Sequence, residues 1–204
     1  GKGPFVHSAC SASYMIPAAL EQLLCRRLAQ SPVILAIDGR CAAGKTTLAA
    51  ALAQQYDAAI IHMDDFFLPP ALRTEARRDE AGGNVHYERF LSEVAPSLRT
   101  HTALTYRRFD CASMDYDPVP RTIPQAALTI VEGSYSLHPA LRHLYTDSLF
   151  LTISPVLQRS RLLARCPERF DRFQSLWIPL EERYIAVCAP DHACSFVLTA
   201  EDCL

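Results

Sequence analysis

The sequence predicts an α/β fold in which a mostly parallel sheet carries helices on both faces. Short apolar runs alternate with helix-like stretches along the whole chain of 204 residues, and strands that alternate with helices form parallel sheets. Half of the residues are apolar and 21% are charged, a composition that excludes intrinsic disorder and provides a sizeable core. No repeat or low-complexity linker divides the chain, so we expect a single domain over residues 1–204.

The first predicted elements are a helix and two buried strands. An apolar stripe of helical period behind Pro17 predicts a helix over 17–30, and we treat residues 1–30 as an N-terminal extension and helix. The runs 33–37 and 58–63 are mostly apolar and partly β-branched, which is typical of strands buried on both faces. The alanine-rich stretch 45–56 between them predicts a helix.

The remaining elements follow a long irregular segment. Residues 64–85 show no periodicity, and such a segment in a compact domain is usually functional or mobile. After it we expect a helix over 86–98, a strand over 103–109 and a proline-rich loop over 117–124. The chain then continues with buried strands over 126–131 and 148–153, a helix over 155–165, a broken basic segment, a helix over 175–188 and a strand over 195–198.

Charge and cysteine content exclude several classes of protein. The net charge is −2, from 20 basic and 22 acidic side chains, so we expect neither a nucleic-acid partner nor a membrane anchor. No apolar run approaches the roughly 20 residues of a bilayer span, and the N-terminus lacks a signal-peptide pattern. The eight cysteines form no C-x-x-C pair, which favours free thiols in the cytoplasm over a zinc site or disulfides.

Lysine and glycine are rare in this chain, and both occur together at one motif. The only lysine after Lys2 is Lys45, and Gly39 to Thr46 match the phosphate-binding pattern G-x-x-x-x-G-K-[ST] between a predicted strand and a helix. In this motif the loop amides and the lysine hold the phosphates, and the Thr46 hydroxyl serves Mg²⁺. The predicted nucleotide-binding residues are Gly39, Arg40, Cys41, Ala42, Ala43, Gly44, Lys45, Thr46 and Thr47.

The surroundings of this motif exclude two classes of P-loop protein. A signalling GTPase needs an N-K-x-D guanine-binding motif, but the only asparagine is Asn84 and no lysine follows it. Motor and AAA-type ATPases usually have an aspartate at the end of their acidic strand, whereas the apolar run here ends at Glu132. We also expect the Cys41 thiol to have a lowered pKa, because it lies at a helix N-terminus.

Four segments in order resemble one group of P-loop kinases. These are Ile37-Asp38-Gly39, residues 61–67, Val131-Glu132-Gly133 and a later arginine-rich segment, and they span about residues 30–185. They resemble the uridine kinase, nicotinamide riboside kinase and phosphoribulokinase group. The resemblance implies a P-loop NTPase fold with a five-stranded sheet and a small arginine-rich lid, here residues 159–175. It also implies Mg²⁺-dependent transfer of the γ-phosphoryl of ATP or GTP to a hydroxyl of a small molecule, such as a nucleoside or ribosyl compound.

The resemblance also assigns catalytic roles. Asp64 matches the carboxylate that accepts the proton of the acceptor hydroxyl, and Lys45 holds the transferred phosphoryl. Glu132 ends an apolar strand and, with Thr46, is the candidate for holding Mg²⁺. The lid arginines that would neutralise the transferred phosphoryl are Arg165 and Arg169.

The region 64–110 is expected to bind the acceptor. Its candidate contacts are Asp65, His86, Tyr87, Arg89, Tyr106 and Arg107. Two departures argue against uridine itself: His86 stands where nucleoside kinases have the aspartate of an N-F-D triplet, and no histidine follows Tyr106 closely. Arg107 and Arg108 would suit an acceptor that already carries a phosphate or carboxylate, or they are exposed loop charges. Asp65 contacts substrate or caps the following turn.

Other interpretations of the sequence remain open. Pantothenate-like and sugar-phosphate acceptors are alternatives within the class, and subunit number differs between members of the group, so a homo-oligomer is allowed. A nucleotide sensor without efficient turnover is the alternative from another class, although a sensor could lose Asp64 and Glu132 without loss of binding. We expect Trp177 and Tyr184, which are seven residues apart, to belong to the core.

Overall fold

The central sheet of the protein has five strands, all parallel. In the computed structural model, which describes residues 14–203, the strands are β1 (Val33–Gly39), β2 (Ala59–His62), β7 (Leu128–Glu132), β8 (Asp147–Thr152) and β9 (Phe196–Thr199). Their spatial order is β2-β7-β1-β8-β9, and each neighbouring pair is parallel. The predicted five-stranded sheet is thus confirmed. Residues 1–13 of the predicted N-terminal extension lie outside the described range.

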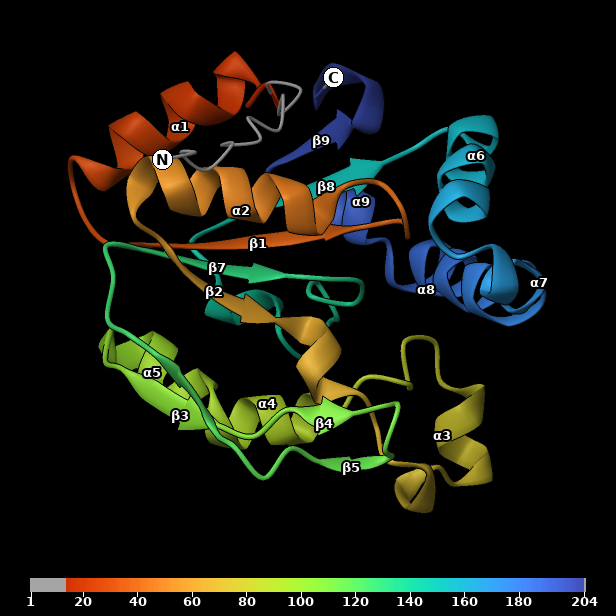
Figure 1. The fold of residues 1–204 in the computed structure, drawn as a ribbon. Coiled ribbons are helices and arrows are strands. Elements are labelled where there is room, and N and C mark those ends of the chain that lie inside the picture. The colour runs from red at the N-terminus through yellow and green to blue at the C-terminus, as the bar shows by residue number, and fades with distance from the viewer. Residues whose placement is uncertain (1–13, 204) are drawn as a thin grey trace, which may run out of the picture.

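Helices cover both faces of this sheet, as Figure 1 shows. On one face α1 (Ala18–Leu28) and α2 (Lys45–Tyr56) pack through Leu24 and Leu48 against the β1 residues Leu35 and Ile37. On the other face α4 (Tyr87–Glu93) and α5 (Ala95–Thr100) belong to a second apolar cluster, which Ile34 of β1 joins. Alternate residues of β1 therefore face opposite cores, and all seven residues of the strand are buried. This is why β1 is apolar without alternation.

The segment after β2 departs from the expected elements. It contains the short helices η1 (Met63–Phe66), η2 (Pro70–Leu72) and α3 (Glu75–Asp79). The helix expected over 86–98 is wrong as one element, because α4 ends at Glu93 and α5 begins at Ala95. Pro96 explains the break: it has no N–H to continue the helical hydrogen bonds and is tolerated only in the first turn of the new helix.

The strand expected over 103–109 is also wrong as one element. The structure has β3 (Leu104–Tyr106) and β4 (Phe109–Asp110), and neither joins the central sheet. β3 pairs antiparallel with β6 (Arg121–Ile123), inside the stretch expected to be loop, and β4 pairs with β5 (Asp115–Tyr116). These hairpins lie below the central sheet in Figure 1.

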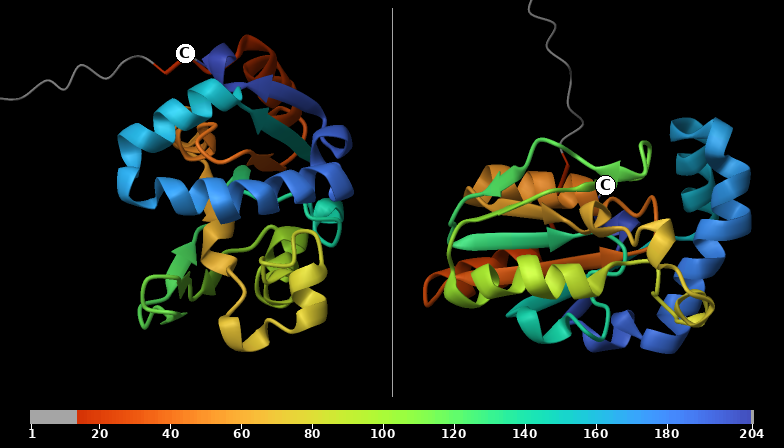
Figure 2. Two further views of the ribbon diagram at one scale, coloured as in Figure 1. Left: turned by 90° about the vertical axis from the view of Figure 1, so that its right-hand side faces the viewer. Right: turned by 90° about the horizontal axis from the view of Figure 1, so that it is seen from below.

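Residues 155–188 form a helical arm at one end of the sheet. It contains α6 (Pro155–Arg165), η4 (Pro167–Arg169), α7 (Phe170–Arg172), the π-helical η5 (Phe173–Trp177) and α8 (Ile178–Cys188), and it faces the viewer in the left panel of Figure 2. η3 (Arg142–Leu144) lies between β7 and β8, α9 (Pro190–Ala193) precedes β9, and η6 (Ala200–Cys203) follows it. None of the helices within residues 14–203 is long and apolar enough to cross a membrane.

Candidate active site

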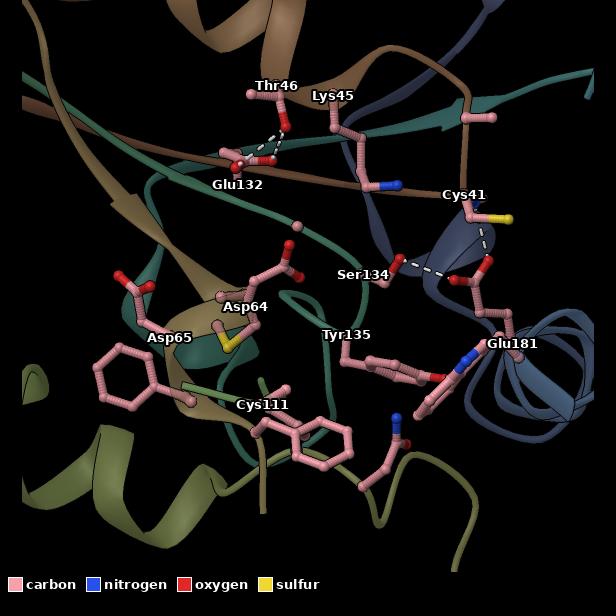
Figure 3. A pocket seen from close by; sticks show the side chains of 18 of the residues that line it. Cys41, Lys45, Thr46, Asp64, Asp65, Cys111, Glu132, Ser134, Tyr135 and Glu181 are labelled. Carbon is pink, nitrogen blue, oxygen red and sulfur yellow. Dashed lines mark hydrogen bonds between the residues drawn. The ribbon is translucent and has the colours of Figure 1, made fainter. Parts of the chain in front are cut away.

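A cavity of about 620 Å³ lies at the carboxyl ends of the central strands. It is bordered by the loop between β1 and α2, by η1, by the turn between β4 and β5, and by the helical arm. This edge is where parallel α/β sheets bind ligands. Figure 3 shows Lys45, Thr46, Asp64 and Glu132 around this cavity, so residues far apart in the sequence converge there.

Two glycines allow the loop between β1 and α2 to turn tightly. A Cβ on Gly39 would lie 2.1 Å from the Leu151 carbonyl oxygen of β8, so no side chain fits there. Gly44 has φ +98°, a left-handed conformation that glycine adopts without steric cost, and α2 begins directly after it. The loop thus has the shape that the phosphate-binding motif predicts.

The ammonium group of Lys45 lies inside the curl of this loop. Its Nζ donates to the carbonyl oxygens of Gly39, at 2.9 Å, and Arg40, at 2.8 Å. The side chain is only 9% exposed, yet it lines the cavity. A cation held in this way can bind an anionic group that enters the cavity.

Glu132, Thr46 and His62 form a group at the end of β7. The Thr46 hydroxyl lies 3.4 Å from both carboxylate oxygens of Glu132, and His62 Nδ1 lies 2.5 Å from Oε1 of the same carboxylate. The hydrogen bond with Glu132 is the main cause of a raised pKa of His62. The sequence did not indicate His62 as part of the site, because its partner is 70 residues away.

The oxygens of Thr46 and Glu132 fit Mg²⁺, a hard cation that takes oxygen ligands. Within residues 14–203 no three His, Cys, Asp or Glu side chains converge as a metal cluster. Magnesium does not need one, because it is commonly bound through one or two carboxylates together with substrate phosphates.

Asp64 is the second residue of η1, the turn after β2, and directs its carboxylate into the cavity (Figure 3). No hydrogen bond or ion pair within the described residues occupies this carboxylate. Asp64 is exposed at the cavity, but partial desolvation by the surrounding protein raises its pKa, the negative charge of Glu132 adds to the rise, and Lys45 opposes it. A carboxylate with a raised pKa is a better proton acceptor than an ordinary aspartate.

The two predicted lid arginines both reach the cavity. Arg165 is the last residue of α6 and Arg169 the last of η4, and the break at Pro167 separates them. Arg161 of α6 instead donates to the Ala42 carbonyl oxygen at 2.9 Å. The arm is therefore attached to the loop between β1 and α2 (residues 40–44, called the phosphate loop below) and also presents two cations to the cavity.

Only one of the six residues predicted to bind the acceptor lines the cavity. It is Asp65, whose buried carboxylate accepts a hydrogen bond from the Tyr106 hydroxyl at 2.6 Å and pairs with Arg121 at 3.3 Å. The other five lie outside the cavity wall: His86, Tyr87, Arg89, Tyr106 and Arg107.

These five residues have other contacts or positions. Arg89 is buried and donates to the backbone oxygens of Asp65 and Arg107. It therefore fixes the backbone of two segments next to the site without lining the cavity. The Tyr87 ring stacks on His138, with 4.4 Å between ring centroids. The Arg107 side chain is exposed.

Aromatic side chains form a wall of the cavity that the sequence analysis missed. The Phe67 ring stacks against Phe109, with 6.5 Å between centroids, and meets Trp177 edge-on at 6.0 Å. We expected Trp177 in the core, and this expectation is wrong: the residue is half-buried and forms part of the cavity wall. Tyr184 is 2% exposed, which confirms its place in the core.

A buried carboxylate from the arm contacts the phosphate loop. Glu181 of α8 accepts hydrogen bonds from the Cys41 N–H at 2.8 Å and from the Ser134 hydroxyl at 3.1 Å. Burial and then the charge of Glu181 raise the pKa of the Cys41 thiol to about 12. The lowered pKa expected from the helix N-terminus is wrong, because desolvation and this carboxylate outweigh it. The seven cysteines within the described range are all free.

No protein-family model and no curated protein matches the sequence. Among solved structures, the fold is similar to a possible uridine kinase from Bacillus stearothermophilus, with 21% identity, a TM-score of 0.62, and coverage of 87% of this chain and 96% of that chain. It is also similar to a protein described as a fructose transport system kinase from Silicibacter sp. TM1040, with 24% identity, a TM-score of 0.59 and coverages of 91% and 98%. A D-glycerate 3-kinase from Cryptococcus neoformans var. grubii matches with 13% identity, a TM-score of 0.61 and coverages of 91% and 97%. The chain thus shares the fold of these three structures, an α/β fold with a five-stranded parallel sheet flanked by helices.

Proposed function

We propose that this protein is a Mg²⁺-dependent kinase that transfers the γ-phosphoryl of ATP or GTP to a hydroxyl of a small molecule. The observation that carries the proposal is the carboxylate of Asp64. It is unpaired among the described residues, it has a raised pKa, and it shares one cavity with Lys45, Thr46 and Glu132. Phosphoryl transfer needs mainly positioning and charge neutralisation, which these groups supply.

In the proposed reaction, the loop amides and Lys45 hold the phosphates of the nucleotide. Asp64 orients the acceptor hydroxyl and accepts its proton while the new oxygen–phosphorus bond forms and the bond to the leaving diphosphate breaks. Arg165 and Arg169 neutralise the charge of the transferred group. When bound beside Thr46 and Glu132, Mg²⁺ would supply further charge neutralisation at the phosphates.

We infer that the acceptor is a nucleoside or ribosyl compound. The support is the wall formed by Phe67, Phe109 and Trp177, because flat aromatic surfaces suit a planar ring. Arg107 and Arg108 were the arginines expected to suit an acceptor phosphate. Arg108 lines the cavity and Arg107 does not, and Arg108 already pairs with Asp110 at 3.2 Å, which favours an acceptor without a phosphate. Sugar-phosphate and pantothenate-like acceptors remain the alternatives that the test below includes.

The test is a coupled ADP-release assay with ATP or GTP, Mg²⁺ and a panel of acceptors. The panel contains uridine, nicotinamide riboside, pantothenate, D-glycerate and ribulose 5-phosphate. We expect one compound to stimulate turnover, and Asp64→Asn to lower this turnover about 100-fold or more while nucleotide binding is kept. Asp57→Asn, at an exposed position, serves as the control and should behave as wild type. Tight nucleotide binding with no stimulation by any acceptor would favour the sensor instead.

A further inference from the structure

The phenol oxygen of Tyr135 is buried at the cavity without a partner. The residue is 7% exposed, and within residues 14–203 its hydroxyl has no hydrogen bond. A polar atom that is buried without a hydrogen-bond partner destabilises the folded protein. Buried hydroxyls in folded proteins are nearly always paired, so an orphaned one in a ligand cavity points to a partner supplied by the ligand.

The backbone of Tyr135 is strained, and contacts with neighbouring residues hold its side chain in place. Tyr135 has φ +74°, a left-handed conformation that is unfavourable for a residue with a side chain. Its N–H donates to Asp38 at 3.1 Å, and its ring packs edge-on against Tyr184 with 4.7 Å between centroids. Strained residues that their surroundings fix in this way cluster at binding sites.

The groups around Tyr135 limit what it can bind. In Figure 3 its ring lies between Asp64 and Glu181. Asn84 lines the same cavity, and its side-chain amide lies near the phenol without a hydrogen bond of ordinary geometry. Burial raises the pKa of the Tyr135 hydroxyl, the nearby carboxylate of Glu181 adds to the rise, and the Asn84 amide opposes it. The negative charge of Glu181 disfavours a phosphate or carboxylate at the same spot.

We propose that the Tyr135 hydroxyl and the Asn84 amide bind an uncharged polar group of the acceptor: a hydroxyl, a carbonyl or a carboxamide. The inference rests on the proposed kinase function and narrows its acceptor. Both side chains can donate and accept hydrogen bonds, so each of these groups can satisfy them. Tyr135 then determines specificity, because an acceptor without such a group leaves the phenol buried and unpaired.

The test compares wild type with Tyr135→Phe, which keeps the ring, its contact with Tyr184 and the backbone. Trp177 is the only tryptophan of the chain and lines the cavity, so its fluorescence reports binding without turnover. Uridine, nicotinamide riboside, pantothenate and D-glycerate are the probes. We expect the bound probe to lose about 5- to 30-fold in affinity in Tyr135→Phe, the loss of one hydrogen bond, while ATP affinity is unchanged.

The matched control is Tyr145→Phe, which removes a hydroxyl that donates to the Ser136 carbonyl oxygen at 2.7 Å. It should lower stability and leave probe affinity unchanged, whereas Tyr135→Phe should leave stability equal or higher. Asn84→Ala should weaken the same probe. Equal probe affinity in Tyr135→Phe and wild type would overturn the proposal, and so would wild type that binds none of the probes.

ADP release measured in the same samples separates this inference from the kinase function. A probe that binds wild type more tightly than Tyr135→Phe but is never phosphorylated would refute the kinase and leave the Tyr135 site standing. Phosphorylation with an unchanged acceptor KM in Tyr135→Phe would leave the kinase standing and refute the site.

Discussion

Replacement of Asp38 by asparagine should destabilise the protein strongly. The Asp38 side chain is 1% exposed and accepts four hydrogen bonds. Oδ1 accepts from the N–H groups of Gly39 at 2.7 Å and Tyr135 at 3.1 Å. Oδ2 accepts from the Leu137 N–H at 3.0 Å and from the Tyr184 hydroxyl at 2.6 Å. This carboxylate thus joins the end of β1 to the loop after β7 and to the arm.

The size of the effect follows from these four bonds. In Asp38→Asn an NH₂ group replaces one oxygen, so in either orientation at least one backbone N–H faces a donor. Loss of a charge-assisted hydrogen bond costs about 1.5–3 kcal/mol, and an unpaired buried N–H costs about 1–3 kcal/mol more. Removal of the buried charge offsets part of this, since burial raises the pKa of Asp38. The net loss should be about 2–4 kcal/mol, which lowers Tm by roughly 4–16 °C in a domain of this size.

Urea unfolding followed by circular dichroism measures this loss. Asp57→Asn is the control, because Asp57 is exposed and has φ +54°, a conformation that asparagine tolerates. If the free energy of unfolding of Asp38→Asn lies within about 1 kcal/mol of the wild-type value, the loss is smaller than expected for an unpaired buried N–H. The four hydrogen bonds then do not hold the loop, and the reasoning fails.

Three further outcomes are expected. Glu181→Gln should bind ATP several-fold more tightly in calorimetry, because it removes a negative charge beside the Cys41 N–H; unchanged or weaker binding would contradict this. Burial lowers the pKa of His138 below 6.5, and its Nδ1 accepts from the Ala140 N–H at 3.1 Å. The stability that neutral His138 contributes is therefore present above about pH 6.5 and is lost as the pH falls through the lowered pKa, so His138→Asn should lose less stability on acidification in urea unfolding; an equal loss would count against it. Iodoacetamide at neutral pH should label the exposed thiols of Cys25 and Cys111 before Cys41, whose pKa is raised to about 12; peptide mass spectrometry that finds Cys41 labelled first would refute this.

Much of the fold could be predicted because its signals are local. The strand β1 is a continuous apolar run, and the phosphate loop follows from the spacing of Gly39, Gly44 and Lys45. The small hairpins could not be predicted in this way, because β3 and β6 are short and stabilise each other through pairing across 17 residues, as between Thr105 and Thr122. Strand preference depends on such partners more than on the residues themselves.

The site residues also fall into those that local sequence signals predict and those that depend on distant contacts. Asp64 and Glu132 each directly follow a predicted strand, so their position at one edge of the sheet follows from topology. Glu181 and Tyr135 were missed because their roles come from distant contacts: Glu181 bonds to a residue 140 positions away and Tyr135 to one 97 positions away. Nothing in their local sequence distinguishes them from ordinary helix and loop residues.

The attachment of the arm has a consequence for how two substrates would bind. The arm contacts the phosphate loop through Arg161 and Glu181, and it contacts the segment after β2 through the Trp177 and Phe67 rings. Any displacement of the arm by one substrate therefore changes the surroundings of the other. Thermodynamic linkage requires the effect to be reciprocal. If bound nucleotide raises the affinity for the acceptor by some factor, bound acceptor raises the affinity for the nucleotide by the same factor.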